Sequence, residues 1–155
     1  MRSSVPPASS RSFALGLACL LILEPLLGQA PPPEPVKKLN IVIVEGDGAV
    51  NNIKQRSARE PIVQIEDENH RPVAGATVTF VLPQSGPGAT FPGGARTLSV
   101  FTDQAGRARA LGLRPNSVPG KFTIQVNASS QGLTSSAVVA QTNVMAAAAA
   151  RVSRL

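Results

Sequence analysis

The chain has 155 residues, enough for one domain, and carries 15 basic and 9 acidic residues for a formal net charge of +6. It has five phenylalanines but neither tryptophan nor tyrosine. Nucleic-acid binding usually relies on clustered cations or aromatic platforms, and the cations here are scattered, so the composition argues against a nucleic-acid partner. The surplus charge instead favours solubility and a loose attraction to anionic surfaces.

Residues 1–30 have the pattern of an export signal. Two arginines precede an uncharged apolar run, Phe13–Leu23, and the small residues Gly28 and Ala30 follow at positions suited to peptidase cleavage. This run of eleven residues is too short to span a bilayer, which needs about twenty. We therefore expect a signal helix that meets the membrane only during export. The mature protein is then expected in the periplasm, at the cell envelope or outside the cell.

The single cysteine, Cys19, lies inside the apolar run. A lipid anchor would place the cysteine at the end of that run, so this position disfavours one. Cleavage of the signal removes Cys19, and we therefore expect neither a disulfide nor thiol chemistry in the mature chain.

Two low-complexity segments flank the predicted folded domain, residues 38–143. Residues 31–37 contain consecutive prolines, which favour an extended polyproline spacer, so we expect a linker there. Residues 144–155 are rich in alanine, but a segment this short is marginal as an isolated helix. We expect a disordered or weakly helical tail.

Short apolar alternations, separated by Gly, Pro, Asn and Asp, fill the folded domain and are typical of an all-β protein. The clearest alternation places Phe122, Ile124 and Val126 on one face, with polar residues between them. The predicted strands are residues 39–45, 61–67, 76–82, 96–102, 107–113, 121–128 and 133–143. In 107–113 the apolar residues fall out of phase, which we attribute to a bulge near Gly112. This pattern predicts a single immunoglobulin-like antiparallel β-sandwich of about seven strands.

Three carboxylates, Glu66, Asp67 and Glu68, lie within four positions of the only histidine, His70. Zinc needs three or four His, Cys or carboxylate ligands, and the mature chain has no second His or Cys. Calcium needs six to eight oxygens, of which Asp67, Glu68 and Asp103 supply a few if their turns meet. We favour the other interpretation, in which Asp67 turns the chain through side-chain-to-backbone hydrogen bonds. We therefore expect no cofactor. The alternative is a metal site formed by Asp67, Glu68 and Asp103.

Glycine, proline and aspartate mark the connections between the predicted strands. The segment 103–106, for example, has Asp first and Gly last, which is the composition of a tight turn. The residues predicted to define turns are Asp67, Pro72, Gly75, Asp103, Gly106 and Gly120.

The residue patterns of common catalytic sites are missing from the sequence. A serine nucleophile needs a base, for which His70 is the sole candidate, and no serine stands in a Gly-x-Ser-x-Gly pattern. The glycine pairs in 46–48 and 86–88 lack the Lys-Ser/Thr that phosphate loops require. The sequence therefore predicts that the protein is not an enzyme.

The segment 83–95 is the candidate binding loop. Thirteen residues are many for a connection between strands, and long loops on a rigid β-scaffold often bind a partner. Its candidate binding residues are Gly86, Thr90, Phe91 and Pro92. Phe91 is either an exposed anchor for the partner or a side chain that folds back over the core.

Three segments, 65–80, 102–110 and 119–132, carry a resemblance to a known family. In the first, a strand ends in Asp, a turn leads to Pro-Val-x-Gly, and a Val-Thr-Phe strand follows. In the others, a Thr-Asp-x-x-Gly-x-Ala turn precedes a long alternating strand. Together they resemble bacterial immunoglobulin-like domains of the invasin/intimin type, over about residues 38–143. The resemblance implies a non-catalytic module for protein binding, adhesion or spacing at the bacterial cell envelope, with a protein or an envelope surface as partner.

The same segments, together with 111–122, are also similar to carboxypeptidase regulatory-like, transthyretin-type β-sandwich domains. That resemblance implies a passive envelope module with no ligand of its own. A third alternative is a module that binds a metal or a carbohydrate through the loops at one end. Edge strands such as 39–45 are able to pair with another chain, so the sequence leaves the oligomeric state open.

Overall fold

The computed structural model describes Gly28 and residues 30–145. Most of the predicted export signal and of the predicted tail lies outside these residues. The described part contains ten β-strands, one 3-10 turn and no α-helix, so the all-β prediction is confirmed. None of its helical residues forms a segment long and apolar enough to cross a membrane. All the strands belong to a compact unit that begins at Glu34.

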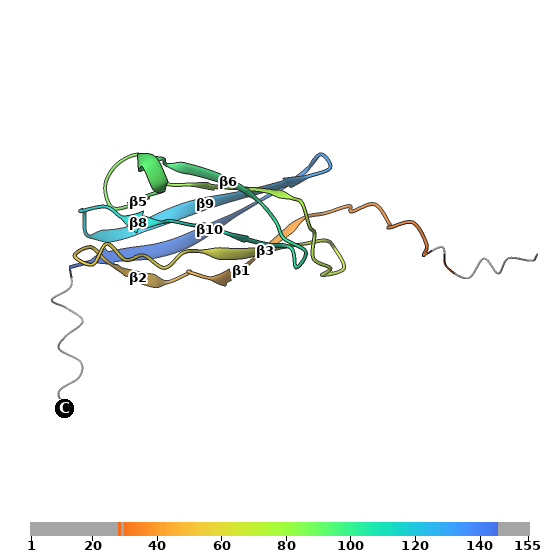
Figure 1. The fold of residues 1–155 in the computed structure, drawn as a ribbon, viewed down its shortest axis with the longest axis horizontal. Coiled ribbons are helices and arrows are strands. Elements are labelled where there is room, and N and C mark those ends of the chain that lie inside the picture. The colour runs from red at the N-terminus through yellow and green to blue at the C-terminus, as the bar shows by residue number, and fades with distance from the viewer. Residues whose placement is uncertain (1–27, 29, 146–155) are drawn as a thin grey trace, which may run out of the picture. The chain divides into compact units, whose positions relative to one another are not determined.

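The strands are short except for the last two, which form a long hairpin (Figure 1). They are β1 (Asn40–Glu45), β2 (Ala49–Asn52), β3 (Ile62–Glu66), β4 (Thr77–Val81), β5 (Ala89–Thr90), β6 (Thr97–Phe101), β7 (Arg107–Arg109), β8 (Arg114–Pro115), β9 (Gly120–Ser130) and β10 (Leu133–Val144). The 3-10 turn, η1, spans Pro92–Gly94 between β5 and β6.

Hydrogen bonds join the strands into three sheets. One contains β1, β3 and β7 in that order, and a curled second sheet has the order β2-β10-β9-β4-β6. The third is the short pair β5-β8. Every neighbouring pair is antiparallel except β2 and β10, which run parallel over Gln141–Val144. The expectation of a purely antiparallel arrangement is therefore wrong for this pair.

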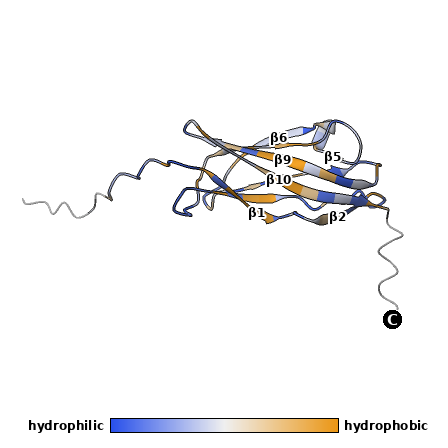
Figure 2. Ribbon diagram, turned by 180° about the vertical axis from the view of Figure 1, so that it is seen from behind, coloured by the Kyte–Doolittle hydropathy of each residue, from blue (hydrophilic) through white to orange (hydrophobic). Residues whose placement is uncertain are grey.

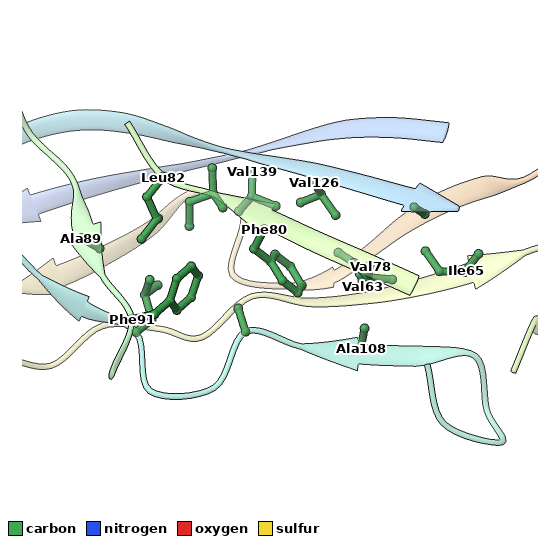
Figure 3. Packing of buried hydrophobic residues seen from close by; sticks show 14 of the residues in the cluster. Val63, Ile65, Val78, Phe80, Leu82, Ala89, Phe91, Ala108, Val126 and Val139 are labelled. Carbon is green, nitrogen blue, oxygen red and sulfur yellow. The ribbon is translucent and has the colours of Figure 1, made fainter. Parts of the chain in front are cut away.

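The two larger sheets bury their inward side chains in one apolar core (Figure 3). On β9, Phe122, Ile124 and Val126 are buried while the residues between them face outward, and the same alternation is visible along the strand in Figure 2. β3 and β4 contribute Val63, Ile65, Val78 and Phe80, which are fully buried. Each such side chain contributes about 1.5–3 kcal/mol, so this core is the main source of stability.

The seven predicted strands correspond to β1, β3, β4, β6, β7, β9 and β10. The predicted strand 107–113 is wrong at its end, because β7 stops at Arg109 and the chain turns at Gly112. Gly112 has a φ of 77°, and a Cβ there would lie 2.6 Å from Cγ of Pro92. A close approach of two segments therefore replaces the expected bulge.

β2, β5 and β8 were not predicted, for physical reasons that differ between them. β5 and β8 have two residues each, too few for a pattern. In β2 the usual polarity is reversed, since Asn51 is buried and Val50 is 65% exposed. A polar residue that faces inward carries no apolar signal in the sequence.

The predicted loop 83–95 contains β5 and η1 and folds back on itself. The amide of Phe91 donates to the carbonyl of Ala95 (2.8 Å), and the amide of Gly94 donates to the carbonyl of Phe91 (3.1 Å). The side chain of Phe91 is only 3% exposed and points into the core that also contains Leu82 (Figure 3). Phe91 is therefore a core residue, and the alternative of an exposed anchor is wrong.

Candidate functional site

Asp67, directly after β3, is the centre of a tight turn. One of its carboxylate oxygens accepts hydrogen bonds from the amides of Asn69 (2.8 Å) and Arg71 (2.9 Å). The other accepts from Nε of Arg71 at 2.8 Å. The fourth residue of the turn, His70, has a φ of 60° and a side chain that is 82% exposed. The carboxylate is thus occupied by the turn that it stabilises.

The turn after β6 repeats this geometry. Asp103 accepts from the amides of Ala105 and Arg107, both at 2.9 Å. The backbone bonds also correspond, because Asp103 pairs with Arg107 as Asp67 pairs with Arg71. The left-handed fourth position, occupied by His70 in the first turn, is Gly106 in the second, with a φ of 70°.

Two carboxyl groups in the first of these turns, those of Asp67 and Glu68, have lowered pKa values. Burial raises the pKa of Asp67, but the backbone amides of Arg71 and Asn69 and the Arg71 guanidinium outweigh it and hold the pKa below its ordinary value. The pKa of Glu68 is also lowered, by hydrogen bonds from its own amide and from the amides of Lys37 and Lys38. Both groups are therefore stabilised in the ionised form.

The carboxylates that the sequence offered as metal ligands do not converge. Glu68 accepts from the amides of Lys37 (3.0 Å) and Lys38 (3.2 Å), while Asp67 and Asp103 are each bound within their own turns. Within Gly28 and residues 30–145, no three His, Cys, Asp or Glu side chains lie close enough to hold a metal ion. We call the two aspartate turns, 67–71 and 103–107, the carboxylate end.

The other predicted turn residues lie where segments approach closely. Pro72 forms a bridge with Glu66, and the amide of Gly75, whose φ is 72°, donates to Thr102 at 3.0 Å. At the start of β9, Gly120 has a φ of 131°, and a Cβ there would lie 2.8 Å from Cγ of Pro87.

β2 and the last residues of β10 lie at the opposite end of the sheets (Figure 1). There a buried cluster of amide side chains fixes the strands. Asn51, Gln141 and Asn143 are each 1% exposed. Nδ2 of Asn51 donates to Gln141 (2.8 Å) and to Asn143 (3.3 Å), which holds β2 beside β10. Gln141 in turn donates to the carbonyls of Gly46 and Arg59.

The same cluster anchors the first part of the candidate binding loop. Asn143 donates to the carbonyl of Gly88 at 2.7 Å, and Asn116 donates to the carbonyl of Gly86 at 2.8 Å. No buried side-chain nitrogen or oxygen in the described residues lacks a hydrogen-bond partner. These amides are therefore structural, and Gly86 serves to seat the loop.

Two hollows open at this end. One, of about 420 Å³, is lined by Thr90, Phe91, Pro92, Gly93, Gly94, Gly112 and Arg114. The other, of about 520 Å³, is lined by Ile53, Lys54, Arg56, Thr90, Arg114, Pro115, Asn116 and Ser117. Thr90 and Arg114 line both, so the hollows adjoin. We call the segments 53–56, 90–94 and 112–117 the basic end.

Three of the four candidate residues of the predicted binding loop, Thr90, Phe91 and Pro92, line these hollows. Sequence reasoning did not find Arg56 or Arg114. They stand far apart in the chain, and no motif links them. The inward amides Gln141 and Asn143 did leave a signal, since they occupy apolar phases of the alternation in β10.

Comparisons with known proteins add no family to this description. No known protein family matches the chain, and no curated protein or solved structure is significantly similar to it. The function is therefore inferred from the residues of this chain alone.

Proposed function

We propose that the chain is a non-catalytic, immunoglobulin-like module that a bacterium exports and that binds a partner at the cell envelope. The fold supports an immunoglobulin-like architecture, because two sheets face one apolar core and antiparallel pairing dominates. The N-terminal pattern of residues 1–30 supports export.

The contrast between the two ends is the observation that carries the binding role. At the carboxylate end Asp67 and Asp103 are occupied by their own turns, and Glu68 by the amides of Lys37 and Lys38. The only histidine, His70, is a solvated turn residue whose ring nitrogen lies 3.2 Å from Glu66. At the basic end, by contrast, two adjoining hollows are open to solvent and lie on a loop that buried amides hold rigid. Open sites on rigid scaffolds are typical of binding modules.

The binding role is tested by sedimentation of the purified protein with bacterial envelope fragments. Thr90 is half-buried and lines both hollows, so Thr90→Trp should obstruct them and reduce co-sedimentation at least about fivefold. The matched control is Thr123→Trp on the exposed outer face of β9, which should leave it unchanged. Equal effects of the two variants, or no sedimentation of the unaltered protein, would refute binding of the cell envelope through the basic end.

Export is tested separately, by fractionation and N-terminal sequencing of the protein made in a bacterial host. The expected result is a protein outside the cytoplasm that lacks the apolar run. Accumulation in the cytoplasm with residues 1–30 intact would contradict the export proposal.

A further inference from the structure

Three cationic residues line the larger hollow of the basic end, and none of them forms an ion pair within the described residues. Lys54, Arg56 and Arg114 share this hollow with Thr90 and Ser117, and no described Asp or Glu lines it. The ion pairs found within residues 30–145 are Arg59–Glu45, His70–Glu66, Arg71–Asp67 and Arg109–Glu60. Like charges that converge without compensation repel one another, so the hollow is electrostatically suited to an anion.

The backbone of Arg56 provides an independent observation. Its φ of 52° lies in the left-handed region, where residues other than glycine pay a conformational cost. Glycine would relieve that cost, and the chain uses glycine at most of its other left-handed positions. An arginine held in this conformation at the rim of a hollow indicates a role for its side chain.

The segments that carry the cations are fixed before any ligand binds. Asn52 and Ser57 close the turn around Arg56 through two backbone hydrogen bonds of 2.9 and 3.1 Å, and Ile53 donates to Val144 at 3.0 Å. Arg114 pairs with Thr90 in the β5-β8 sheet. Little ordering is therefore required on binding, which favours affinity.

We propose that this hollow binds a phosphate group. A phosphate carries one or two negative charges and several acceptor oxygens, which match two guanidinium groups, an ammonium group and neighbouring hydroxyls. The inference deepens the proposed function and rests on it for the place of the ligand, an envelope molecule that carries phosphate. A soluble phosphate compound and a lipid headgroup present the same chemistry.

The test measures two ligands on the purified protein at low ionic strength, where exposed charges are least screened. Inorganic pyrophosphate is titrated by calorimetry, and vesicles of phosphatidylcholine, with or without phosphatidylglycerol, are sedimented with the protein. Arg56→Gly should weaken binding about tenfold while its thermal midpoint stays equal or rises, because the substitution removes the cation and relieves the backbone. A structural role of Arg56 would instead lower the midpoint.

Two matched controls separate the loss of the Arg56 side chain from the relief of backbone strain and from a general change in net charge. Gln131→Gly relieves the same backbone strain, at φ 50° in the β9–β10 turn, and should leave binding unchanged. Arg107→Ala removes one positive charge at the carboxylate end and should also leave it unchanged. If Arg56→Gly does not fold, Arg114→Ala provides the same test.

The site is supported by binding of pyrophosphate, or by binding of vesicles only when they contain phosphatidylglycerol. In either case Arg56→Gly should weaken the binding and both controls should leave it unchanged. The ligand that binds shows whether the phosphate belongs to a soluble compound or to a lipid headgroup. Three results would overturn the phosphate site: no binding of either ligand, undiminished binding by Arg56→Gly, or a loss of binding in Arg107→Ala as large as in Arg56→Gly. A loss of envelope binding in Thr90→Trp with no response to phosphate refutes this inference alone. Phosphate binding without envelope sedimentation refutes the proposed envelope role alone.

Discussion

The carboxylate end and the basic end both lie largely in connections between strands, yet they use their polar groups differently. At the carboxylate end, Asp67 and Asp103 accept hydrogen bonds from their own turns. At the basic end the buried structural bonds are made by the neutral amides Asn51, Gln141 and Asn143, and the carboxylate of Glu60 accepts from the amide of Gly112 at 2.7 Å. Among the described residues that line the larger hollow, Lys54, Arg56 and Arg114 are charged and none is a carboxylate.

Under the proposed function, this difference leaves one end of a small β-protein for architecture and the other for a ligand. Charged groups that form part of a turn are already compensated and offer little to a partner. Charged groups on a platform of neutral hydrogen bonds remain available.

The largest effect is expected at Gly106, in the second aspartate turn. Gly106→Ala places a Cβ 2.7 Å from the carbonyl oxygen of Ile65 at a φ of 70°, so we expect a loss of about 3 kcal/mol in the free energy of unfolding. Gly86→Ala, at the other end, has a similar φ of 74° but open space around it. It should cost only about 1 kcal/mol. Urea denaturation of both variants checks the prediction, and equal losses would show that the turn at Gly106 is not tightly packed.

The next effect concerns the buried amides. Asn143→Ala leaves the carbonyl of Gly88 without its 2.7 Å donor, so we expect a loss of about 2 kcal/mol and faster hydrogen exchange at the amide of Asn116, which donates to the same carbonyl. The control is Asn127→Ala, whose half-buried side chain accepts a hydrogen bond from Ser136. A loss as small as that of the control would contradict a structural role for the amide cluster.

Acid should destabilise the carboxylate end first. The pKa of Asp67 in the fold lies below its ordinary value of about 3.9, so its ionised form stabilises the protein at higher pH. That contribution is lost as the pH falls through the lowered pKa, and Glu68 acts in the same direction. Thermal midpoints measured from neutral pH downward should fall less steeply in Asp67→Asn than in the unaltered protein. Parallel profiles would refute the assigned role of the Asp67 carboxylate.

The smallest effect is expected at His70, which occupies the position of Gly106 in the first turn. His70→Gly relieves a φ of 60° and removes only an exposed contact with Glu66, so we expect a gain of about 0.5–1 kcal/mol. Chemical denaturation checks this. A destabilised variant would mean that the two turns are not equivalent.

Alternation of apolar residues was enough to predict seven strands, because their inward faces are apolar, as in β9. It failed for β2, whose inward residue is Asn51, and it could not foresee a parallel pairing between β2 and the last strand. Such pairing depends on contacts between residues far apart in the chain.

The candidate site was predictable only in part. The length of the loop 83–95 pointed to Thr90 and Pro92, which line the hollows. Arg56 and Arg114 meet there through the fold, and no local pattern announces them. Phe91 could not be placed from sequence, because a loop phenylalanine fits a binding surface and a core equally well.

The most direct test of the difference between the ends is a map of amide chemical shifts in the purified protein as pyrophosphate is added. We expect shifts that saturate and are confined to residues 53–56, 90–94 and 112–117, the segments that line the hollows. Shifts spread over both ends, or centred on the turns 67–71 and 103–107, would contradict it.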